Sequence, residues 1–485
     1  MVRLYTDHPV YANDIADEAR LFAGREEIVP SDGEDCDISI TLTEQNGFWR
    51  ATAKADLNGK HAEYTLERPA YSGEALEVKR REKRAMKIAA FRALRAIYGF
   101  TPPWGSLTGI RPTRLLRELI EREGEAEALN MMAEDFDVSA DKLALARGIV
   151  EVQSPMLAGL SDSVADVYVN IPFCPTKCSY CSFPSKVRTA GDDMDAYLSA
   201  LERDIELGAA LLRDSARSVR ALYIGGGTPT VLDARELARL FDALRRHYGN
   251  FGGEFTLEAG RPDSITKEKL AVLRAYGVTR VSVNPQSMNA KTLALVGRSH
   301  TPGDVERAFA LAREAGFDNI NMDVIAGLPG EDAKDMEYTL ERIARLSPES
   351  LTVHTLALKR ASLLVPDGEA FPLPEAALAA EMLRLGAAFA RGLGMRPYYM
   401  YRQKFMRGNL ENVGYAKPGS ECVYNVDMME DAASILAHGA GGMTKRVFDA
   451  QRRVERVPAP KDIEAYAAKV EALAAEKRSL FLDFN

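Results

Sequence analysis

The sequence predicts an α/β fold whose central part is a parallel sheet that curls into all or part of a barrel. Residues 164–360 alternate short apolar, β-prone runs with longer segments of helical periodicity, and this order repeats six times. Parallel strands joined by right-handed helical crossovers form such a curled sheet. In barrels of this kind the chemistry lies at the C-terminal ends of the strands, so functional residues are expected in the loops that follow them.

Periodicity also places the individual elements of this central part. Strands are expected at 166–171, 219–225, 254–259, 279–284, 318–325 and 351–357. Helices are expected between them at 193–214, 233–247, 265–276, 289–296, 303–315 and 331–346.

The first 155 residues form a separate appendage with a different pattern. Three strands are expected at 37–43, 48–53 and 61–66, the first two joined by a Gln-Asn-Gly turn. Residues 79–98 carry apolar side chains at helical spacing, and their other face is basic. That face fits either a solvated surface or a surface that meets an anion such as RNA or a polycarboxylate substrate. The segment is expected to be an α+β and helical domain.

Beyond residue 360 the sequence predicts a further α/β extension. A long helix is expected at 374–393 and a polar surface helix at 460–480. Between them, residues 396–407 are rich in tyrosine and basic side chains.

Composition and charge restrict the class of protein. The chain has 485 residues, of which 46% are hydrophobic and 27% charged, as in a soluble protein of two or three domains. The net charge of −8 does not favour nucleic acid as a partner. The N-terminus lacks an apolar signal core, and no apolar run approaches about 18 residues, so no membrane span is expected. Five cysteines are too few for a disulfide framework, and a thiolate cluster needs a reducing compartment, so we expect a cytoplasmic protein.

Three cysteines, Cys174, Cys178 and Cys181, lie directly after the first expected strand with the spacing Cys-x3-Cys-x2-Cys. Iron–sulfur clusters are normally held by four thiolates, so three would leave one iron of a [4Fe–4S] cluster open to an outside ligand. A structural zinc would need a fourth nearby Cys or His, and none occurs between Cys181 and His247. A disulfide cannot use all three thiols. The pattern therefore predicts a [4Fe–4S] cluster, and Cys422, remote in sequence, is not expected to be a ligand.

This stretch resembles the radical S-adenosylmethionine (SAM) enzymes, which share this spacing and an aromatic residue before the last cysteine, here Tyr180. Tyr-Val-Asn-Ile-Pro-Phe-Cys at 168–174 is similar, more narrowly, to the oxygen-independent coproporphyrinogen III oxidase (dehydrogenase) family and its haem-chaperone relatives. The long N-terminal extension resembles the long-form branch. The resemblance implies a radical SAM partial (β/α)6 TIM-like barrel. The expected domains are residues 1–155, a radical SAM core at 160–360, and an extension at 361–485 that covers the active site.

Later strand ends resemble the SAM-binding residues of the family. The second strand ends in Gly-Gly-Gly-Thr-Pro-Thr, and the resemblance implies that Gly226, Gly227 and Thr228 meet the amino-acid part of SAM. It assigns the SAM carboxylate to Arg298, and a guanidinium suits a carboxylate. The remaining SAM contacts that it implies are Tyr168, Glu258, Gln286, Asp323 and Ala357. Side-chain oxygens of Glu, Gln and Asp suit ribose hydroxyl groups.

The resemblance implies oxidative decarboxylation of coproporphyrinogen III to protoporphyrinogen IX in haem biosynthesis, by a 5′-deoxyadenosyl radical. The cluster cysteines, SAM, a tetrapyrrole substrate and an external flavodoxin- or ferredoxin-like electron donor all belong to this hypothesis. The aromatic and basic segment either covers the tetrapyrrole and pairs with its carboxylates or forms an ordinary edge strand. The residues concerned are Tyr398, Tyr399, Tyr401, Arg402 and Lys404.

Two positions depart from the family pattern and keep alternatives open. Phe183 stands where many family enzymes carry a fourth cysteine, and Asn170 stands where many carry histidine. Phenylalanine at 183 is shared with the haem-chaperone relatives, so haem transfer with the same cluster and SAM site is the alternative function. A radical SAM RNA-modifying enzyme is a second alternative, which would use the basic helix and bind RNA in a salt-dependent way.

Overall fold

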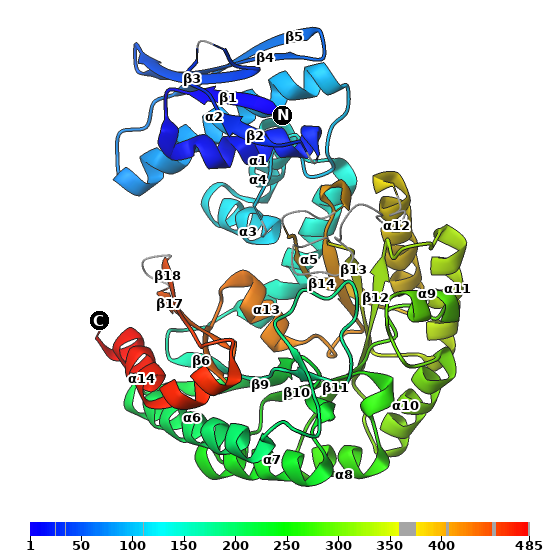
Figure 1. Cartoon of the computed structure of the whole chain (residues 1–485). Helices are drawn as coiled ribbons and strands as arrows, with labels where there is room; N and C mark the ends of the chain where they lie inside the picture. Colours follow the sequence, from blue (N-terminus) through cyan, green and yellow to red (C-terminus); the bar gives the residue numbers. More distant parts are fainter. Residues whose placement is uncertain are drawn as a thin grey trace. The chain divides into compact units, whose positions relative to one another are not determined.

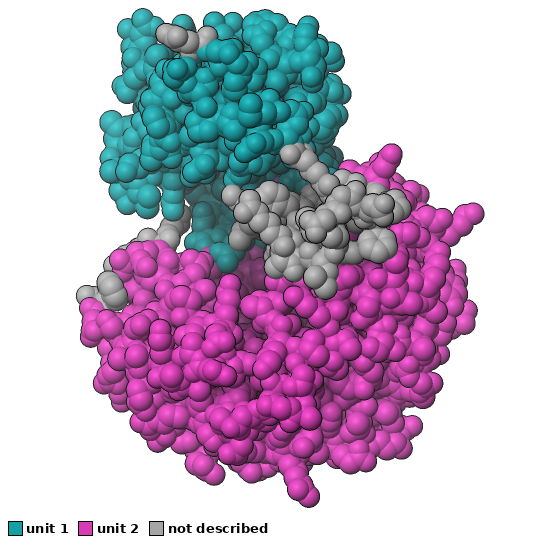
Figure 2. All heavy atoms as spheres, viewed as in Figure 1, with its two compact units in different colours: residues 1–147, 408–410 teal, residues 148–407, 411–485 magenta. Residues whose placement is uncertain are grey.

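The computed structural model describes residues 1–24, 26–33, 35–109, 111–357, 375–403, 407–448 and 453–483. The chain separates into two compact units, residues 1–147 with 408–410 and residues 148–407 with 411–485, coloured separately in Figure 2. The division falls inside one helix, α5 (Ala140–Leu157). Separate roles for 1–155, 160–360 and 361–485 stay a prediction.

Unit 1 is built on a five-stranded sheet in the order β2-β1-β3-β4-β5. Its three expected strands are confirmed as β3 (Ile38–Gln45), β4 (Phe48–Leu57) and β5 (Lys60–Pro69). The sequence did not predict β1 (Val2–Thr6), β2 (Ile28–Pro30), η1 (Pro9–Tyr11) or α1 (Ala12–Ala23). The other elements are α2 (Ala75–Tyr98), α3 (Pro112–Glu123), α4 (Glu125–Asn130) and the π-helical turn η2 (Met131–Asp135).

The basic face of α2 is largely neutralised within unit 1. Lys83 and Lys87 pair with two acids of α1, at 3.2 Å and 3.0 Å between nitrogen and oxygen. Arg92 and Arg95 share the carboxylate of Asp137 at 3.0 Å and 2.5 Å. The apolar face of the helix is buried, with Met86, Ala89, Ala90, Phe91, Ala93, Leu94 and Ile97 in the core. Because these cations are paired within unit 1, the basic face of α2 fits a solvated surface better than a binding site for an external anion.

Unit 2 contains the expected parallel sheet, curled into part of a barrel with helices on its outer side (Figure 1). Its six parallel strands are β6 (Val164–Ile171), β9 (Ser218–Gly226), β10 (Glu254–Gly260), β11 (Arg280–Val283), β12 (Ile320–Ala326) and β13 (Ser350–Thr355). The helices between and after them are α6 (Met194–Asp214), α7 (Ala234–Tyr248), α8 (Lys267–Ala275), α9 (Ala290–Leu295), α10 (Pro302–Glu314), α11 (Ala333–Leu346) and α12 (Ala376–Gly392). All thirteen lie within a few residues of their expected positions.

C-terminal strands extend this sheet at both edges, which the sequence did not predict. At one edge β16 (Ser434–His438) pairs parallel to β6, followed by β17 (Met443–Phe448) and β18 (Arg453–Pro458). At the other edge β15 (Asn412–Ala416) pairs antiparallel to β13, and β14 (Arg396–Tyr401) lies outermost. Of these strands the sequence offered only β14, as one of its two interpretations of residues 396–407, and Lys404 lies outside the described residues.

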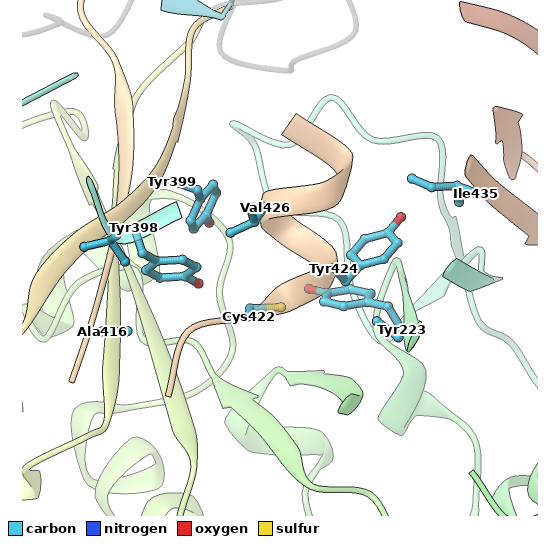
Figure 3. Close-up of a cluster of buried hydrophobic side chains, with 10 residues drawn as sticks. Tyr223, Tyr398, Tyr399, Ala416, Cys422, Tyr424, Val426 and Ile435 are labelled. Atoms are coloured by element: carbon cyan, nitrogen blue, oxygen red, sulfur yellow. The ribbon is translucent and has the colours of Figure 1, made fainter. Parts of the chain in front are cut away.

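An aromatic cluster inside unit 2 joins the two edges of the sheet (Figure 3). Helix α13 (Val423–Glu430) places Tyr424 on Tyr223 of β9, with 4.5 Å between the ring centroids. The same cluster includes Tyr398 and Tyr399 of β14, and Ile435 of β16. Burying these large side chains of β14, α13 and β16 against β9 stabilises the packing of both edge regions on the sheet.

Helix α14 (Ile463–Leu482) confirms the expected helix at 460–480, and its outer face is exposed as predicted. Its inner face carries a buried ion pair that the sequence did not predict. Lys477 is 1% exposed, and its Nζ lies 2.6 Å from Oδ1 of Asp204 on α6, which is also buried. Tyr466 donates a hydrogen bond to the other oxygen of Asp204, at 2.8 Å. A charged side chain looks exposed in a sequence unless its distant partner is known.

The remaining short elements of unit 2 are β7 (Phe173–Cys174), β8 (Lys186–Val187), η3 (Pro229–Val231) and η4 (Pro262–Ser264). The short η5 (Arg407–Asn409) spans the division between the units. Among the helices in the described ranges, none is long and apolar enough to cross a membrane.

Candidate cluster and cofactor site

The cysteine loop follows β6 directly and is held by backbone hydrogen bonds. Strand β7 pairs with β8, which fixes the chain on both sides of Cys174. The N–H of Ser179 donates to the carbonyl of Val296 at 3.0 Å, and the N–H of Cys181 donates to the carbonyl of Cys178 at 3.1 Å. Cys178 is buried, and Cys174 and Cys181 are half-buried free thiols. The three cysteines therefore lie on one short, ordered loop at the C-terminal end of a barrel strand.

The glycine loop after β9 packs against this cysteine loop. Gly227 donates its N–H to the carbonyl of Ile171 at 2.8 Å, and the hydroxyl of Thr228 lies 3.5 Å from Cys174 Sγ. A Cβ on Gly227 would lie 2.5 Å from the carbonyl oxygen of Phe173 and 2.9 Å from Cys174 Sγ. Only glycine permits this approach. The structure thus brings the predicted glycine loop, including Gly226, against the first cysteine.

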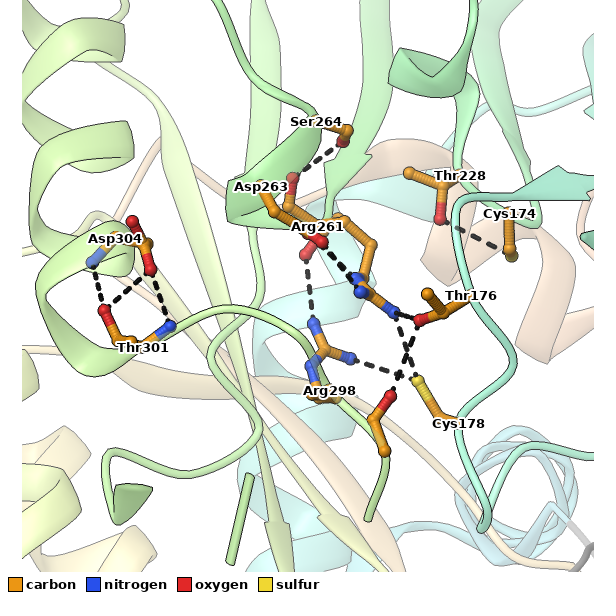
Figure 4. A network of polar contacts seen from close by, with 12 residues as sticks. Cys174, Thr176, Cys178, Thr228, Arg261, Asp263, Ser264, Arg298, Thr301 and Asp304 are labelled. Atoms are coloured by element: carbon orange, nitrogen blue, oxygen red, sulfur yellow. Dashed lines mark hydrogen bonds and ion pairs between the residues drawn. The ribbon is translucent and has the colours of Figure 1, made fainter. Parts of the chain in front are cut away.

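Two buried arginines converge on the second cysteine (Figure 4). Arg298 Nη1 lies 4.0 Å from Cys178 Sγ and donates to the hydroxyl of Tyr180 at 2.8 Å. Its Nη2 donates to the carbonyl of Asn284 at 2.7 Å. No carboxylate in the described part of the chain pairs with Arg298, and its buried Nε has no hydrogen-bond partner there. Arg298 is therefore a largely uncompensated cation at the site.

The second arginine, Arg261, was not predicted as a site residue. Its Nη1 donates to Cys178 Sγ at 3.5 Å. Burial, followed by the positive charges of Arg298 and Arg261, lowers the pKa of the neighbouring His300 to about 4 despite the nearby Asp263. The positive charge on this side of the site therefore favours the binding of an anion. The sequence carried a weak signal, an arginine and an acid two residues apart directly after a barrel strand.

Glu258 lies on the opposite side of the glycine loop. Tyr223 donates its hydroxyl to Glu258 Oε1 at 2.5 Å. A Cβ on Gly225 would lie 3.2 Å from Glu258 Oε2, so the carboxyl group lies directly against the loop. Burial raises the pKa of Glu258 to about 7; the Tyr223 hydrogen bond opposes the rise, and the charge of Asp323 adds to it.

Asp323 and Gln286 are joined through their backbones. The N–H of Gln286 donates to the carbonyl of Asp323 at 2.9 Å, and Gln286 has a left-handed φ of 64°. A non-glycine residue is rarely found there, and such strain clusters at functional sites. Gln286 Oε1 is buried with no hydrogen-bond partner among the described residues. Burial would raise the pKa of Asp323, but hydrogen bonding and charge from His354, with Asn321 and Thr352, hold it below its usual value.

The last two predicted residues lie at the outer strands of the site. Tyr168 of β6 donates to Asn170 Oδ1 at 2.9 Å, and its ring lies 5.8 Å from that of Tyr424. Ala357 follows β13 by two residues and is the last described residue before 358–374. The structure therefore places all the predicted residues at or just beyond the C-terminal ends of the parallel strands.

Comparison with known proteins assigns this arrangement to a family. The model of the radical SAM superfamily matches residues 168–343. Over 402 residues the chain is 37% identical to the oxygen-independent coproporphyrinogen-III oxidase-like protein HemZ of Bacillus subtilis (strain 168), covering 81% of this chain and 80% of HemZ. The chain belongs to the radical SAM superfamily, in the oxygen-independent coproporphyrinogen III oxidase-like family. The resemblance found in the sequence is confirmed.

Other relatives of this radical SAM protein include both a heme chaperone and a coproporphyrinogen III oxidase. It is 32% identical over 306 residues to the heme chaperone HemW of Mycobacterium tuberculosis (strain ATCC 25618 / H37Rv), covering 61% of this chain and 74% of HemW. Among solved structures, coproporphyrinogen III oxidase (HemN) from Escherichia coli matches with a TM-score of 0.51 and 25% identity, over 67% of this chain and 73% of HemN. The partial-barrel fold is thereby confirmed, and the family relationship leaves the specific activity open.

The residues of this radical SAM protein fit the cofactors of its family. No three Cys, His, Asp or Glu side chains of the described ranges surround a single ion. A [4Fe–4S] cluster needs a different arrangement from a single ion, because each thiolate binds a different iron atom of the cluster. Two guanidinium groups at Cys178 favour the anionic thiolate. Burial raises the pKa of the Cys181 thiol and so disfavours its thiolate form. Binding to iron would stabilise the thiolate. The buried, unpartnered Nε of Arg298 and Oε1 of Gln286 suit a polar ligand such as SAM.

Proposed function

We propose that this protein is a radical SAM coproporphyrinogen III dehydrogenase, which decarboxylates coproporphyrinogen III to protoporphyrinogen IX without oxygen. The observation that carries the proposal is the meeting of the cysteine loop, the glycine loop and the uncompensated Arg298 at one end of the barrel. The similarity to the oxidase-like HemZ supports it, because that similarity covers 81% of the chain and not the radical SAM core alone.

In this proposal each part of the site has a defined role. Cys174, Cys178 and Cys181 hold the cluster, and Arg298 pairs with the SAM carboxylate. The other residues assigned to SAM are Tyr168, Gly226, Gly227, Thr228, Glu258, Gln286, Asp323 and Ala357. When bound, the cluster and SAM supply a carbon-centred radical that removes hydrogen from a substrate propionate. The residues of the chain orient the cofactors and exclude water from the reacting carbon.

Burial separates the roles that we propose for the aromatic side chains of β14. Tyr398 is 1% exposed and Tyr399 is 5% exposed, and both pack in the aromatic cluster. The hydroxyl of Tyr401 lies 3.3 Å from His354 Nδ1, and His354 Nε2 lies 3.7 Å from Asp323. We therefore assign substrate contact to Tyr401 and a packing role to Tyr398 and Tyr399.

A haem chaperone is the second candidate, because one observation favours it. Phe183 is 66% exposed on the cysteine loop, where the family enzymes often carry a fourth cysteine. The chaperone HemW is also a relative with 32% identity. RNA modification is not proposed, because the cations of α2 are paired with acids of unit 1. A cytoplasmic location and an external flavodoxin- or ferredoxin-like electron donor remain part of the proposal.

The experiment that separates the two candidates is anaerobic turnover. The cluster is reconstituted, dithionite, SAM and coproporphyrinogen III are added, and porphyrin products and 5′-deoxyadenosine are measured by mass spectrometry. Loss of two carbon dioxide molecules per substrate supports the dehydrogenase. SAM cleavage without porphyrin products, together with tight haem binding, supports the chaperone.

Two variants test the site itself. Cys178→Ala should lose the cluster and all SAM cleavage, and a retained cluster signal would contradict the ligand assignment. Arg298→Ala should keep the cluster but bind SAM about 10-fold or more weakly, because a charge-assisted hydrogen bond to a carboxylate is lost. Normal SAM binding by this variant would contradict the role of Arg298.

A further inference from the structure

We infer that Arg261 is a positioning residue for the cluster: it donates a hydrogen bond to the sulfur of Cys178 and thereby makes the one-electron reduction of the bound cluster more favourable. This inference rests on the proposed cluster site and deepens it. Arg261 Nη1 lies 3.5 Å from Cys178 Sγ, and the side chain of Arg261 is only 4% exposed. Hydrogen bonds to ligating sulfurs are one of the means by which a protein sets a cluster's reduction potential.

All three nitrogens of the Arg261 guanidinium donate hydrogen bonds to neighbouring side chains. Its Nε and Nη2 donate to the two oxygens of Asp263, at 3.0 Å and 2.8 Å, in a bidentate pair. Its Nη1 also donates to the hydroxyl of Thr176 at 3.0 Å, inside the cysteine loop (Figure 4). Because the planar fork is pre-organised, little freedom is lost when it binds the sulfur.

The backbone after β10 points this side chain toward the cysteines. The pairing of β10 with β11 shifts register between Leu257 and Gly260, and Gly260 has a left-handed φ of 54°. The next turn, η4, is stabilised by a hydrogen bond that Ser264 Oγ donates to the carbonyl of Arg261 at 2.7 Å. Thr230 in turn donates to the carbonyl of Ala259 at 2.8 Å. The backbone conformation at the end of β10 therefore fixes the position of Arg261.

The two arginines at Cys178 have different surroundings and therefore different roles. Arg298 lies farther from the sulfur, at 4.0 Å, and has no carboxylate partner among the described residues. Arg261 lies closer, and its charge is already balanced by Asp263. A cation that remains uncompensated suits an incoming carboxylate, whereas a balanced and braced guanidinium suits a fixed hydrogen bond to the sulfur.

The expected effect follows from charge. Reduction adds one electron, supplied by dithionite in the assay, and makes the cluster and its thiolates more negative; no bond breaks and no proton moves. A hydrogen bond to Cys178 Sγ stabilises this more negative state more than the oxidised one. Removing the bond should therefore shift the midpoint potential to a more negative value.

The test uses the full-length protein with a reconstituted cluster. Arg261→Gln removes the charged donor, and Arg261→Gln combined with Asp263→Asn also avoids leaving the Asp263 carboxylate without its partner. Arg342→Gln is the matched control, because Arg342 likewise donates to one carboxylate, Glu306 at 2.9 Å, but does so between the outer helices α10 and α11. Iron and sulfide content, circular dichroism and a redox titration followed by electron paramagnetic resonance are measured for each.

We expect both Arg261 variants to retain the cluster with a more negative midpoint potential, and Arg342→Gln to match the wild type. An unchanged potential in cluster-loaded Arg261 variants would overturn this inference alone. Loss of the cluster from both folded Arg261 variants would also contradict it, because the three cysteines should suffice to hold the cluster. A wild-type protein that takes up no cluster would overturn the proposed function, and the inference with it.

Discussion

Glu258 and Asp323 show how two carboxyl groups of one site acquire different charges near neutral pH. Burial raises the pKa of Glu258 to about 7, although a hydrogen bond from Tyr223 and the charges of Arg280 and His354 oppose this rise. Asp323 has a pKa below its usual value because His354 and neighbouring polar side chains outweigh its burial. Near neutral pH, therefore, Asp323 is anionic while Glu258 exchanges its proton.

This difference predicts a pH dependence of SAM binding. If ribose hydroxyl groups donate to Glu258, binding favours its anionic form and lowers its pKa, so the complex binds fewer protons than the free protein. The dissociation constant should then fall by about three- to tenfold between pH 6 and pH 8. Anaerobic equilibrium dialysis measures it, with Glu258→Gln as the variant that should lose the dependence. An equally steep profile in Glu258→Gln would place the titrating group elsewhere.

Folding stability should respond to pH with the opposite sign. The pKa of Glu258 is raised in the folded state, so the folded chain holds a proton that the unfolded chain has lost between about pH 4.3 and pH 7. The contribution of Glu258 to the free energy of unfolding therefore decreases as pH rises through this range.

At the residue scale, the sequence predicted side chains whose role depends on spacing and missed those whose role depends on partners. The cysteines and the glycine loop are adjacent in sequence, so their pattern is visible without a structure. The role of Arg261 depends on its contact with Cys178, 83 residues away. The raised pKa of Glu258 depends on its burial by the folded chain. Both follow only from the path of the chain.

Among the elements, the glycine loop after β9 is tightly constrained by the cysteine loop. Gly227→Ala would place a methyl group 2.5 Å from the carbonyl oxygen of Phe173 and 2.9 Å from Cys174 Sγ. Because backbone must move to admit it, we expect reduced iron content after reconstitution and at least tenfold weaker SAM binding. Gly252→Ala, where a Cβ would meet nothing within 4 Å, is the control. Equal iron content in both variants would show that the two loops do not need this close approach.

Three ion pairs join helix α14 to α6, and two of them differ in burial at nearly the same distance, which makes a matched test. Asp204 and Lys477 are buried and 2.6 Å apart, whereas Arg203 and Glu471 are exposed and 2.7 Å apart. Asp204→Ala should lower the free energy of unfolding by about 3–5 kcal/mol, since it leaves a buried ammonium unpaired. Arg203→Ala should lower it far less, because solvent screens an exposed pair. Chemical denaturation measures both, and similar losses would contradict the importance of burial.

Elements were predictable where their signal is local. The six βα units follow from periodicity within each segment, and even the short α9 lies close to its expected position. The pairing of β16 with β6 joins residues about 270 positions apart and leaves no local trace. The buried ion pair of α14 was missed for the same reason, because the partner of Lys477 lies on α6.

On the scale of the whole molecule, the two compact units have separate cores and separate spectroscopic reporters. The chain contains two tryptophans, Trp49 and Trp104, and both belong to unit 1. All three cluster cysteines belong to unit 2. Tryptophan fluorescence therefore follows the unfolding of unit 1, whereas far-ultraviolet circular dichroism follows both units.

This separation predicts how the cofactors stabilise the protein. A ligand that binds only the folded form of one unit raises the free energy of unfolding of that unit, by about 2.7 kcal/mol when its concentration is 100 times its dissociation constant. Cluster reconstitution and saturating SAM should thus raise the transition detected by circular dichroism for unit 2, while the midpoint detected by tryptophan fluorescence stays unchanged. The cluster can quench the fluorescence, but quenching changes its intensity and not its midpoint. A fluorescence midpoint that rises together with the circular dichroism midpoint would show that the two units unfold as one cooperative body, and unit 1 would then be energetically coupled to the radical SAM site.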